Sequence, residues 1–194
     1  MINFGINLNL VIICWTVFFL YWLVSAFFVK QSATKADWRF AIIWRAIVAV
    51  LVIIFFRFNR AIAISFFSFL FFRSFLSYVI AGTVLTVLGL IIALWARIFL
   101  GRNWSNYDTY KKEHELITAG PYRFLRHPIY SGAILMLIGT FLYYGVLIIL
   151  IILAIATLFV VWRIWHEEKT MIKLFGKKYT DYMKRTKRLI PWIY

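Results

Sequence analysis

The chain has 194 residues, of which 64% are hydrophobic and 21% aromatic, and 22 Lys and Arg against 7 Asp and Glu give a formal net charge of +15. A soluble domain exposes roughly half of its residues to water, so it cannot hide this much apolar surface. The composition therefore excludes an ordinary soluble protein and indicates an integral membrane protein. Most basic residues flank apolar runs, so topology and anionic lipid headgroups explain the charge better than a nucleic-acid partner does.

The single cysteine, Cys14, lies in the first apolar run, at about residues 8–29. One cysteine excludes an internal disulfide and a multi-cysteine metal site. No basic segment precedes this run and no small-residue cleavage site follows it. We therefore expect a retained helix rather than a signal peptide.

Apolar runs predict the transmembrane helices, because crossing a bilayer takes about 20 mainly apolar residues. The first three runs of suitable length lie at about residues 8–29, 40–56 and 75–100. A shorter apolar stretch at residues 61–71 cannot span, and we interpret it as an interfacial or re-entrant piece.

The last apolar block, residues 129–165, is too long for one span and too short for two spans with an ordinary loop. Within it, Tyr143-Tyr144-Gly145 supplies a tight break, which predicts a helical hairpin. The expected fold is therefore all-α, a single transmembrane domain over residues 1–194 with about five transmembrane helices.

The distribution of basic residues predicts the orientation. With five spans, one side of the membrane receives the link at residues 30–39, the polar segment at 101–126 and the tail from residue 166. These segments hold most of the lysines and arginines outside the spans. By the positive-inside rule the N-terminus is expected outside and the C-terminus in the cytoplasm.

Two polar stretches, residues 107–130 and 163–194, flank the predicted hairpin. Because a hairpin folds back on itself, its two ends must meet near one membrane interface, and groups from both stretches should converge there. In the first stretch Gly120-Pro121 is a turn signal, and Pro128 suits the first turn of a helix.

Four polar or aromatic residues of the first stretch are candidates for a binding site. Arg126 and His127 would lie at a helix N-terminus, where free backbone N–H groups favour anions. Tyr122 and Tyr130 can pack against a flat ring or a cation. The same residues also suit an ordinary interfacial belt, and their chemistry alone leaves both interpretations open.

In the second stretch Arg163 and Glu167 are four residues apart, so they share one face of a helix. They form either a surface ion pair or a site in which Arg163 presents its planar guanidinium to a carboxylate or phosphate while Glu167 orients it. Glu168 would point about 100° away, and we expect it to be solvated. Gly176 can end this helix, and the basic and aromatic residues after it predict an amphipathic segment on the membrane.

Neither a metal site nor three common enzyme classes find support in the sequence. The three histidines, His114, His127 and His166, lack the spacing and the acidic or cysteine partners of a metal motif. The sequence contains no G-x-S-x-G, Walker A or G-x-G-x-x-G pattern, which leaves a hydrolase, an ATPase and a Rossmann enzyme unsupported.

A series of short motifs carries more information together than singly. They are LGRNW at residues 100–104, HELI at 114–117 with GPY at 120–122, RHPIYSG at 126–132, and RIWHEE at 163–168 with FGKKY at 175–179. In this order, from about residue 97 onward, the sequence resembles the isoprenylcysteine carboxyl methyltransferase family, a group of S-adenosylmethionine-dependent integral membrane enzymes. The RHPIYSG element alone also resembles phospholipid methyltransferases.

The resemblance implies that S-adenosyl-L-methionine binds over the hairpin, in the region of residues 101–194, while residues 1–100 supply N-terminal spans. The implied cofactor-binding residues are His114, Glu115, Leu116, Ile117, Tyr122, His127, Pro128, Ile129 and Tyr130. Glu115 lies inside this segment, although the family does not require a glutamate there. Arg163 and Glu167 are implied to face the methyl acceptor as the catalytic residues.

The implied reaction is that of a protein-S-isoprenylcysteine O-methyltransferase, which forms a methyl ester on the C-terminal carboxylate of a lipidated cysteine. The prenylated or otherwise lipophilic acceptor would enter from the bilayer, and the cofactor from the cytoplasm. A C-terminal carboxylate has a pKa of about 3.3–3.7, so it is ionised at neutral pH and needs no general base.

Three alternatives stay open at this point. The first is phospholipid N-methylation from the same cofactor site, which requires an amine with a pKa of about 10 to lose a proton first. The second is an NADPH-dependent membrane reductase, because some sterol reductases resemble this C-terminal arrangement. The third is a lipid-binding scaffold without activity. The expected location is the cell membrane in a prokaryote or the endoplasmic reticulum in a eukaryote.

Overall fold

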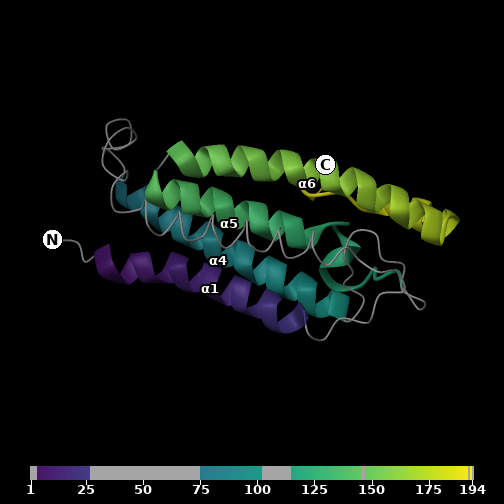
Figure 1. The fold of residues 1–194 in the computed structure, drawn as a ribbon, viewed down its shortest axis with the longest axis horizontal. Helices are drawn as coiled ribbons and strands as arrows, with labels where there is room; N and C mark the ends of the chain where they lie inside the picture. The colour runs from purple at the N-terminus through teal and green to yellow at the C-terminus, as the bar shows by residue number, and fades with distance from the viewer. Residues whose placement is uncertain (1–3, 27–74, 102–114, 146, 192, 194) are drawn as a thin grey trace, which may run out of the picture.

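The computed structural model describes residues 4–26, 75–101, 115–145, 147–191 and 193. Within them the chain forms a short 3-10 helix and five α-helices, which are α1 (Phe4–Ala26), α4 (Phe75–Leu100), η3 (Gly120–Arg123), α5 (Pro128–Tyr144), α6 (Leu147–Phe175) and α7 (Lys177–Arg185). The four long helices run side by side, with α1 against α4 and with α5 between α4 and α6 (Figure 1). The all-α class is confirmed for the described residues.

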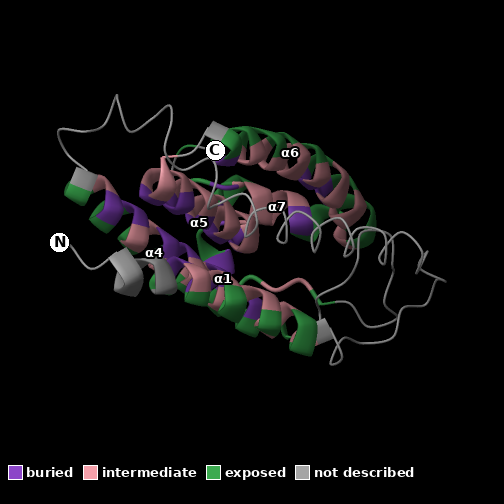
Figure 2. Cartoon of the chain, turned by 60° about the vertical axis from the view of Figure 1, so that its left-hand side comes forward, coloured by how far each residue is buried: buried purple, intermediate pink, exposed green. Residues whose placement is uncertain are grey.

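Among the residues that the structure describes, two helices are long and apolar enough to cross a membrane, over Leu76–Leu100 in α4 and Ile148–Phe175 in α6. Helices α1 and α5 contain shorter apolar stretches, Leu10–Ser25 and Pro128–Tyr144. Figure 2 shows exposed residues along the outer faces of α1, α4 and α6, and many are large and apolar, such as Leu158 at 72% exposure. Lipid is the solvent that accommodates such outward-facing side chains.

In the N-terminal half of the chain, the described residues cover only some of the predicted spans. The predicted span at residues 75–100 coincides with α4, and the first apolar run, predicted at 8–29, forms α1 at Phe4–Ala26. The second predicted span, residues 40–56, and the interfacial piece at 61–71 lie outside the described residues. The total of five spans therefore stays a prediction.

The predicted helical hairpin is confirmed. Helix α5 ends at Tyr144, and Gly145 follows with a φ of 60° while its N–H donates to the Phe141 carbonyl at 2.8 Å. Glycine suits this left-handed conformation because it has no Cβ to clash with the backbone. Helix α6 begins at Leu147, so only residues 145 and 146 separate the two helices. At its other end α6 stops where predicted, before Gly176, which has a φ of 52°.

Glycines allow α4 and α5 to pack backbone against backbone. A Cβ on Gly82 would lie 2.6 Å from the Gly139 carbonyl oxygen, and a Cβ on Gly132 would lie 2.6 Å from that of Gly89. On each helix the two glycines are seven residues apart, about two helical turns, so they lie on one face. Small residues of this kind let membrane helices approach closely. The contact fixes α5, whose N-terminus carries the candidate site.

The C-terminal tail folds back onto the segment that leads into α5, a feature that the sequence did not predict. The Arg126 N–H donates to the Lys187 carbonyl at 2.7 Å, and the Lys187 N–H donates to the Phe124 carbonyl at 3.2 Å. The His127 N–H donates to the Arg188 carbonyl at 3.1 Å. These bonds form a short parallel bridge, so residues far apart in sequence lie side by side at the start of α5.

Candidate active site

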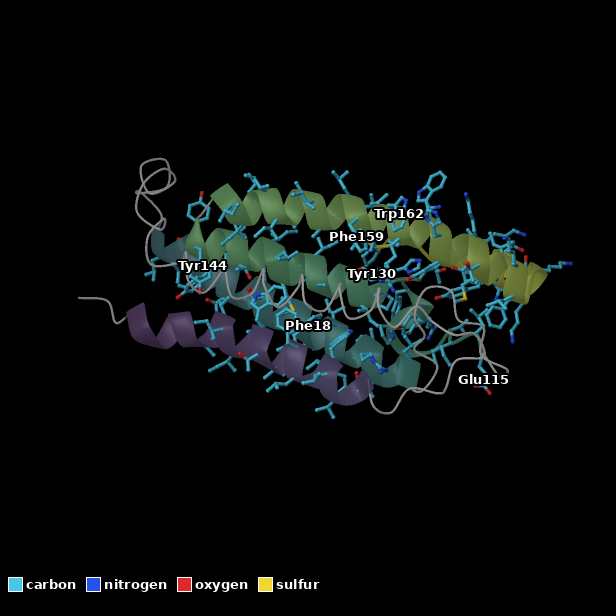
Figure 3. All side chains as sticks on the ribbon, viewed as in Figure 1. Phe18, Glu115, Tyr130, Tyr144, Phe159 and Trp162 are labelled. Carbon is cyan, nitrogen blue, oxygen red and sulfur yellow. The ribbon has the colours of Figure 1, made fainter. Side chains whose placement is uncertain are left out.

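The first turn of α5 aims two candidate side chains at α6. Pro128 begins the helix, as predicted, where the N–H that proline lacks would have no partner within the helix. His127 precedes it, and the His127 carbonyl accepts the Ser131 N–H at 3.1 Å. Tyr130 follows in the first turn, and Figure 3 shows it on the side of α5 that faces α6.

Tyr130, Arg163 and Glu167 form the centre of the site. The Tyr130 hydroxyl donates to Glu167 Oε1 at 2.7 Å, and Arg163 Nε donates to the same oxygen at 2.8 Å. The Arg163 guanidinium carbon also lies 5.8 Å from the centre of the Tyr130 ring. A phenol and a guanidinium thus converge on one carboxylate oxygen, and α5 and α6 meet as the hairpin argument predicted.

His127 lies between two carboxylates. Its ring stacks on Tyr130 with centroids 5.7 Å apart and planes 18° apart. Nδ1 is 3.5 Å from Glu167 Oε2, and Nε2 is 3.7 Å from Glu168 Oε1, both longer than an ordinary hydrogen bond. Nε2 is buried and has no hydrogen-bond partner within the part of the chain that the structure describes.

The expectation that Glu168 is solvated is wrong. Glu168 is only 3% exposed, and its carboxylate accepts from Arg126 Nε at 2.7 Å and from Arg188 Nε at 3.0 Å. The angle on the helical wheel is consistent with this outcome, because Glu168 shares a face with fully buried Ile164. The error came from assuming that water surrounds that face, whereas the returning tail covers it.

The arginine of the RHPIYSG element has an internal role. Besides Glu168, the Arg126 guanidinium donates to the carbonyls of Met183 at 3.2 Å and Thr186 at 2.5 Å. These bonds direct the guanidinium toward the tail rather than toward an external anion at the start of α5. Arg126 therefore joins three segments that are distant in the sequence.

Helix α7 packs its aromatic face on the protein, whereas the sequence predicted an amphipathic segment on the membrane. Tyr179 is 3% exposed, and the Tyr182 hydroxyl donates to the Tyr122 carbonyl at 2.7 Å. Burial raises the pKa of the phenols of Tyr122, Tyr179 and Tyr182 above the ordinary value. The tail is thus held by side chains as well as by backbone.

The remaining predicted cofactor residues occupy less central positions. Leu116, Ile117 and Ile129 are half-buried, whereas Glu115 is exposed and lies well away from Tyr130 in Figure 3. Tyr122 is buried in η3, next to α4. His114 lies outside the described residues.

The structure therefore brings together His127, Tyr130, Arg163 and Glu167 among the predicted site residues. Sequence reasoning missed Glu168, and it also missed Arg188, a tail residue in no motif. The alignment of Ile164 with Glu168 on one helical face was the available signal for Glu168. For Arg188 the sequence offers no comparable signal, because its role depends on where the tail returns.

Comparison with protein families decides the family. Residues 77–178, more than half of the chain, match the phospholipid methyltransferase family. The chain belongs to this family. The matched region contains most of α4, all of α5 and α6, and every site residue that the sequence predicted.

Several proteins similar to this chain have names that are more specific than the name of the family. Protein-S-isoprenylcysteine O-methyltransferase B of Arabidopsis thaliana is 33% identical over 119 residues, which cover 58% of this chain and 58% of that protein. The protein-S-isoprenylcysteine O-methyltransferase of Dictyostelium discoideum is 33% identical over 151 residues, covering 71% of this chain and 62% of that protein. The rat enzyme of the same name is 31% identical over 120 residues, covering 58% and 41%. The chain thus spans about two fifths to three fifths of the length of these relatives.

A solved structure supports the fold. The structure of a eukaryotic intramembrane Ras methyltransferase, isoprenylcysteine carboxyl methyltransferase, matches with a TM-score of 0.53 and 23% sequence identity, covering 83% of this chain and 55% of that chain. The all-α intramembrane fold expected for this family member is therefore confirmed, while the orientation of its termini stays a prediction.

Proposed function

We propose that the chain is an S-adenosylmethionine-dependent membrane methyltransferase that esterifies the C-terminal carboxylate of a prenylated cysteine. The observation that carries this proposal is the convergence of Tyr130 and Arg163 on one carboxylate oxygen of Glu167. Donors that hold one carboxylate can hold another. Family membership and the names of the relatives support the same reaction.

The residues at the start of α5 fit S-adenosylmethionine. His127 and Tyr130 offer stacked aromatic rings, and His127 Nε2 is a buried polar atom with no hydrogen-bond partner in the described residues. Glu167 supplies a negative charge beside them. When bound, the cofactor supplies the electrophilic methyl group of its sulfonium. His127, Pro128, Ile129 and Tyr130 would hold it, with residues 114–117 and Tyr122 from the preceding segment.

Arg163 is the residue that binds the acceptor carboxylate, and Glu167 orients Arg163. The acceptor carboxylate is already ionised, with a pKa of about 3.3–3.7, so the enzyme has to position and desolvate it rather than deprotonate it. Arg163 and Glu167 have side chains 23% and 21% exposed, so the pair is shielded yet reachable. Tyr130 adds one donor without adding charge.

The lipid part of the acceptor would approach through the bilayer along the apolar surfaces of the hairpin. Residues 101–194 carry the cofactor and acceptor groups, and residues 1–100 supply spans, α1 and α4 among them. The protein is a multi-pass membrane protein with its N-terminus outside and its C-terminus in the cytoplasm, as the charge distribution of the sequence indicates.

Phospholipid N-methylation is the second candidate, because the matched family bears that name. An amine acceptor must lose a proton, and Glu167, 3.5 Å from His127 Nδ1, is the group placed to accept it. The two reactions differ in what they leave on the product, an ester or a methylated amine.

The test is transfer of a radiolabelled methyl group from S-adenosylmethionine by the purified protein in lipid nanodiscs. A prenylated cysteine analogue and phosphatidylethanolamine are offered together. We expect base-labile label on the cysteine analogue and saturable binding of S-adenosylhomocysteine but not of NADPH. Base-stable label in the lipid headgroup would establish the second candidate, and binding of NADPH alone would refute both.

A further inference from the structure

A buried charge cluster lies next to the site, on the neighbouring face of α6. It consists of Glu168, Arg126 and Arg188, which we call the tail clamp. Arg126 Nε is 2.7 Å from Glu168 Oε1, and the Arg188 terminal nitrogen is 2.9 Å from Glu168 Oε2. The side chain of Glu168 is 5% exposed and that of Arg126 8% exposed, so both charges are withdrawn from solvent. Each oxygen of Glu168 has its own arginine.

The tail clamp joins three segments that are distant from one another in the sequence. Glu168 belongs to α6, Arg126 to the segment before α5, and Arg188 to the tail after α7. Backbone bonds reinforce the joint, since the tail pairs with residues 124–127 and the Ser131 hydroxyl donates to the Leu189 carbonyl at 2.6 Å. The tail is therefore held both to α6 and to the first turn of α5.

The tail clamp has a direct geometric consequence for the site. Glu167 and Glu168 are consecutive in α6, so fixing the direction of one side chain fixes the rotation of the helix and hence the direction of the other. Helix α6 contacts α5 far less extensively than α4 does, and its outward face is exposed. Packing within the hairpin alone therefore constrains the rotation of α6 weakly.

From these contacts we infer that Glu168, Arg126 and Arg188 are positioning residues, which hold Glu167 and Arg163 against Tyr130 and His127. The C-terminal tail is thereby part of the active site without supplying a catalytic group. The inference rests on the proposed function only for its kinetic readout, because the position of His127 can be measured without any substrate.

The test compares Arg188→Gln and Glu168→Gln with a matched control, Asp181→Asn. Asp181 pairs with Lys184 at 3.0 Å on α7 in the same tail, but that ion pair is exposed, with side chains 42% and 76% accessible. The Arg188→Lys variant keeps the positive charge and serves as the conservative rescue. Size-exclusion chromatography in detergent identifies variants that fail to fold, and the remaining variant then carries the test.

The first readout is the rate at which diethylpyrocarbonate modifies His127, mapped by mass spectrometry. The His127 side chain is 9% exposed, so we expect diethylpyrocarbonate to modify it slowly in the parent protein and in Asp181→Asn. We expect modification to be about tenfold faster in Arg188→Gln and Glu168→Gln, with partial recovery in Arg188→Lys. Unchanged modification in both folded variants would overturn the inference, whatever the chain catalyses.

The second readout is the division of the kinetic effect between kcat and KM. Misplacement of reacting groups by about 1 Å can cost roughly a hundredfold in rate, so we expect kcat to fall ten- to a hundredfold in the two clamp variants. S-adenosylhomocysteine should still bind, with an affinity within about fivefold. A purely stabilising role would leave kcat of the folded fraction within twofold and would contradict the inference. Absence of methyl transfer by the parent protein, which carries no substitution, would refute the proposed function instead.

Discussion

The two interfaces of α5 are held by different kinds of contact. Toward α4, the glycines Gly82 and Gly139 bring backbone against backbone, which leaves no room for adjustment. Toward α6, a hydrogen bond joins Tyr130 in the first turn of α5 to Glu167. The difference separates a rigid support from a junction that depends on charges and hydrogen bonds, and only the junction carries groups suited to chemistry.

Breaking the rigid interface should have the largest effect. In Gly82→Val the new side chain would meet the Gly139 carbonyl and the Tyr143 backbone, both 2.6 Å from the Cβ, and backbone cannot move aside cheaply. We expect a loss of stability of about 3 kcal/mol or more and little folded protein. The matched control is Ala81→Val, at an exposed neighbouring position on α4. Yield and thermal stability in detergent measure both, and equal values would contradict the account.

Breaking the junction should abolish activity and spare the fold. We expect Arg163→Ala to lower kcat/KM at least a hundredfold, because it removes the proposed partner of the acceptor carboxylate, and Glu167→Gln to lower it by a similar factor. Arg163→Lys should recover only part of the activity, since a lysine lacks the planar fork. Methyl transfer is measured on variants whose thermal midpoint stays within about 3 °C of the parent. Full activity in Arg163→Ala would exclude an acceptor role.

Removing one neutral donor should have a moderate effect. Tyr130→Phe keeps the ring that stacks on His127 and faces Arg163, but it loses the hydroxyl that donates to Glu167. A hydrogen bond to a charged carboxylate is worth about 1.5 kcal/mol or more, so we expect a kcat about tenfold lower. Tyr130→Ala, which also removes the ring, should lose far more. Identical kinetics in the two variants would show that the hydroxyl and the ring are not separate contributions.

The smallest expected effect is a loss of stability at alkaline pH, where the tail loosens. Burial raises the pKa of Tyr182 above the ordinary value near 10, so folding favours its protonated form. The resulting stability is present below the unfolded pKa and is lost as the pH rises through the higher folded pKa. We expect Tyr182→Phe to lose about 1 kcal/mol at pH 8 and to show a flatter decline above pH 10. Parallel pH profiles of thermal stability for both proteins would contradict this assignment.

The sequence predicted the parts of the fold that depend on local patterns. The hairpin followed from the length of one apolar block and from Gly145, and the convergence of Tyr130 with Arg163 and Glu167 followed from the hairpin. The hydrophobicity of the two helices could not predict the α4–α5 contact, because both are apolar on all sides, and the seven-residue spacing of the glycines on each helix was the available signal. The helical face that Glu168 shares with Ile164 was a local signal of its burial, but its partner Arg188 could not be predicted, because Arg188 lies on a tail that returns some 20 residues later.

The most direct test of the carboxylate site is a thermodynamic cycle between the acceptor and Arg163. The inhibition constants of a non-reactive prenylated cysteine acid analogue and of its carboxamide are measured on the parent protein and on Arg163→Ala. We predict that the acid binds the parent at least about tenfold more tightly than the amide, as expected for a charge-assisted hydrogen bond, and that Arg163→Ala removes this difference. Equal binding of acid and amide by the parent, or a difference that persists without Arg163, would contradict the claim that Arg163 binds the acceptor carboxylate.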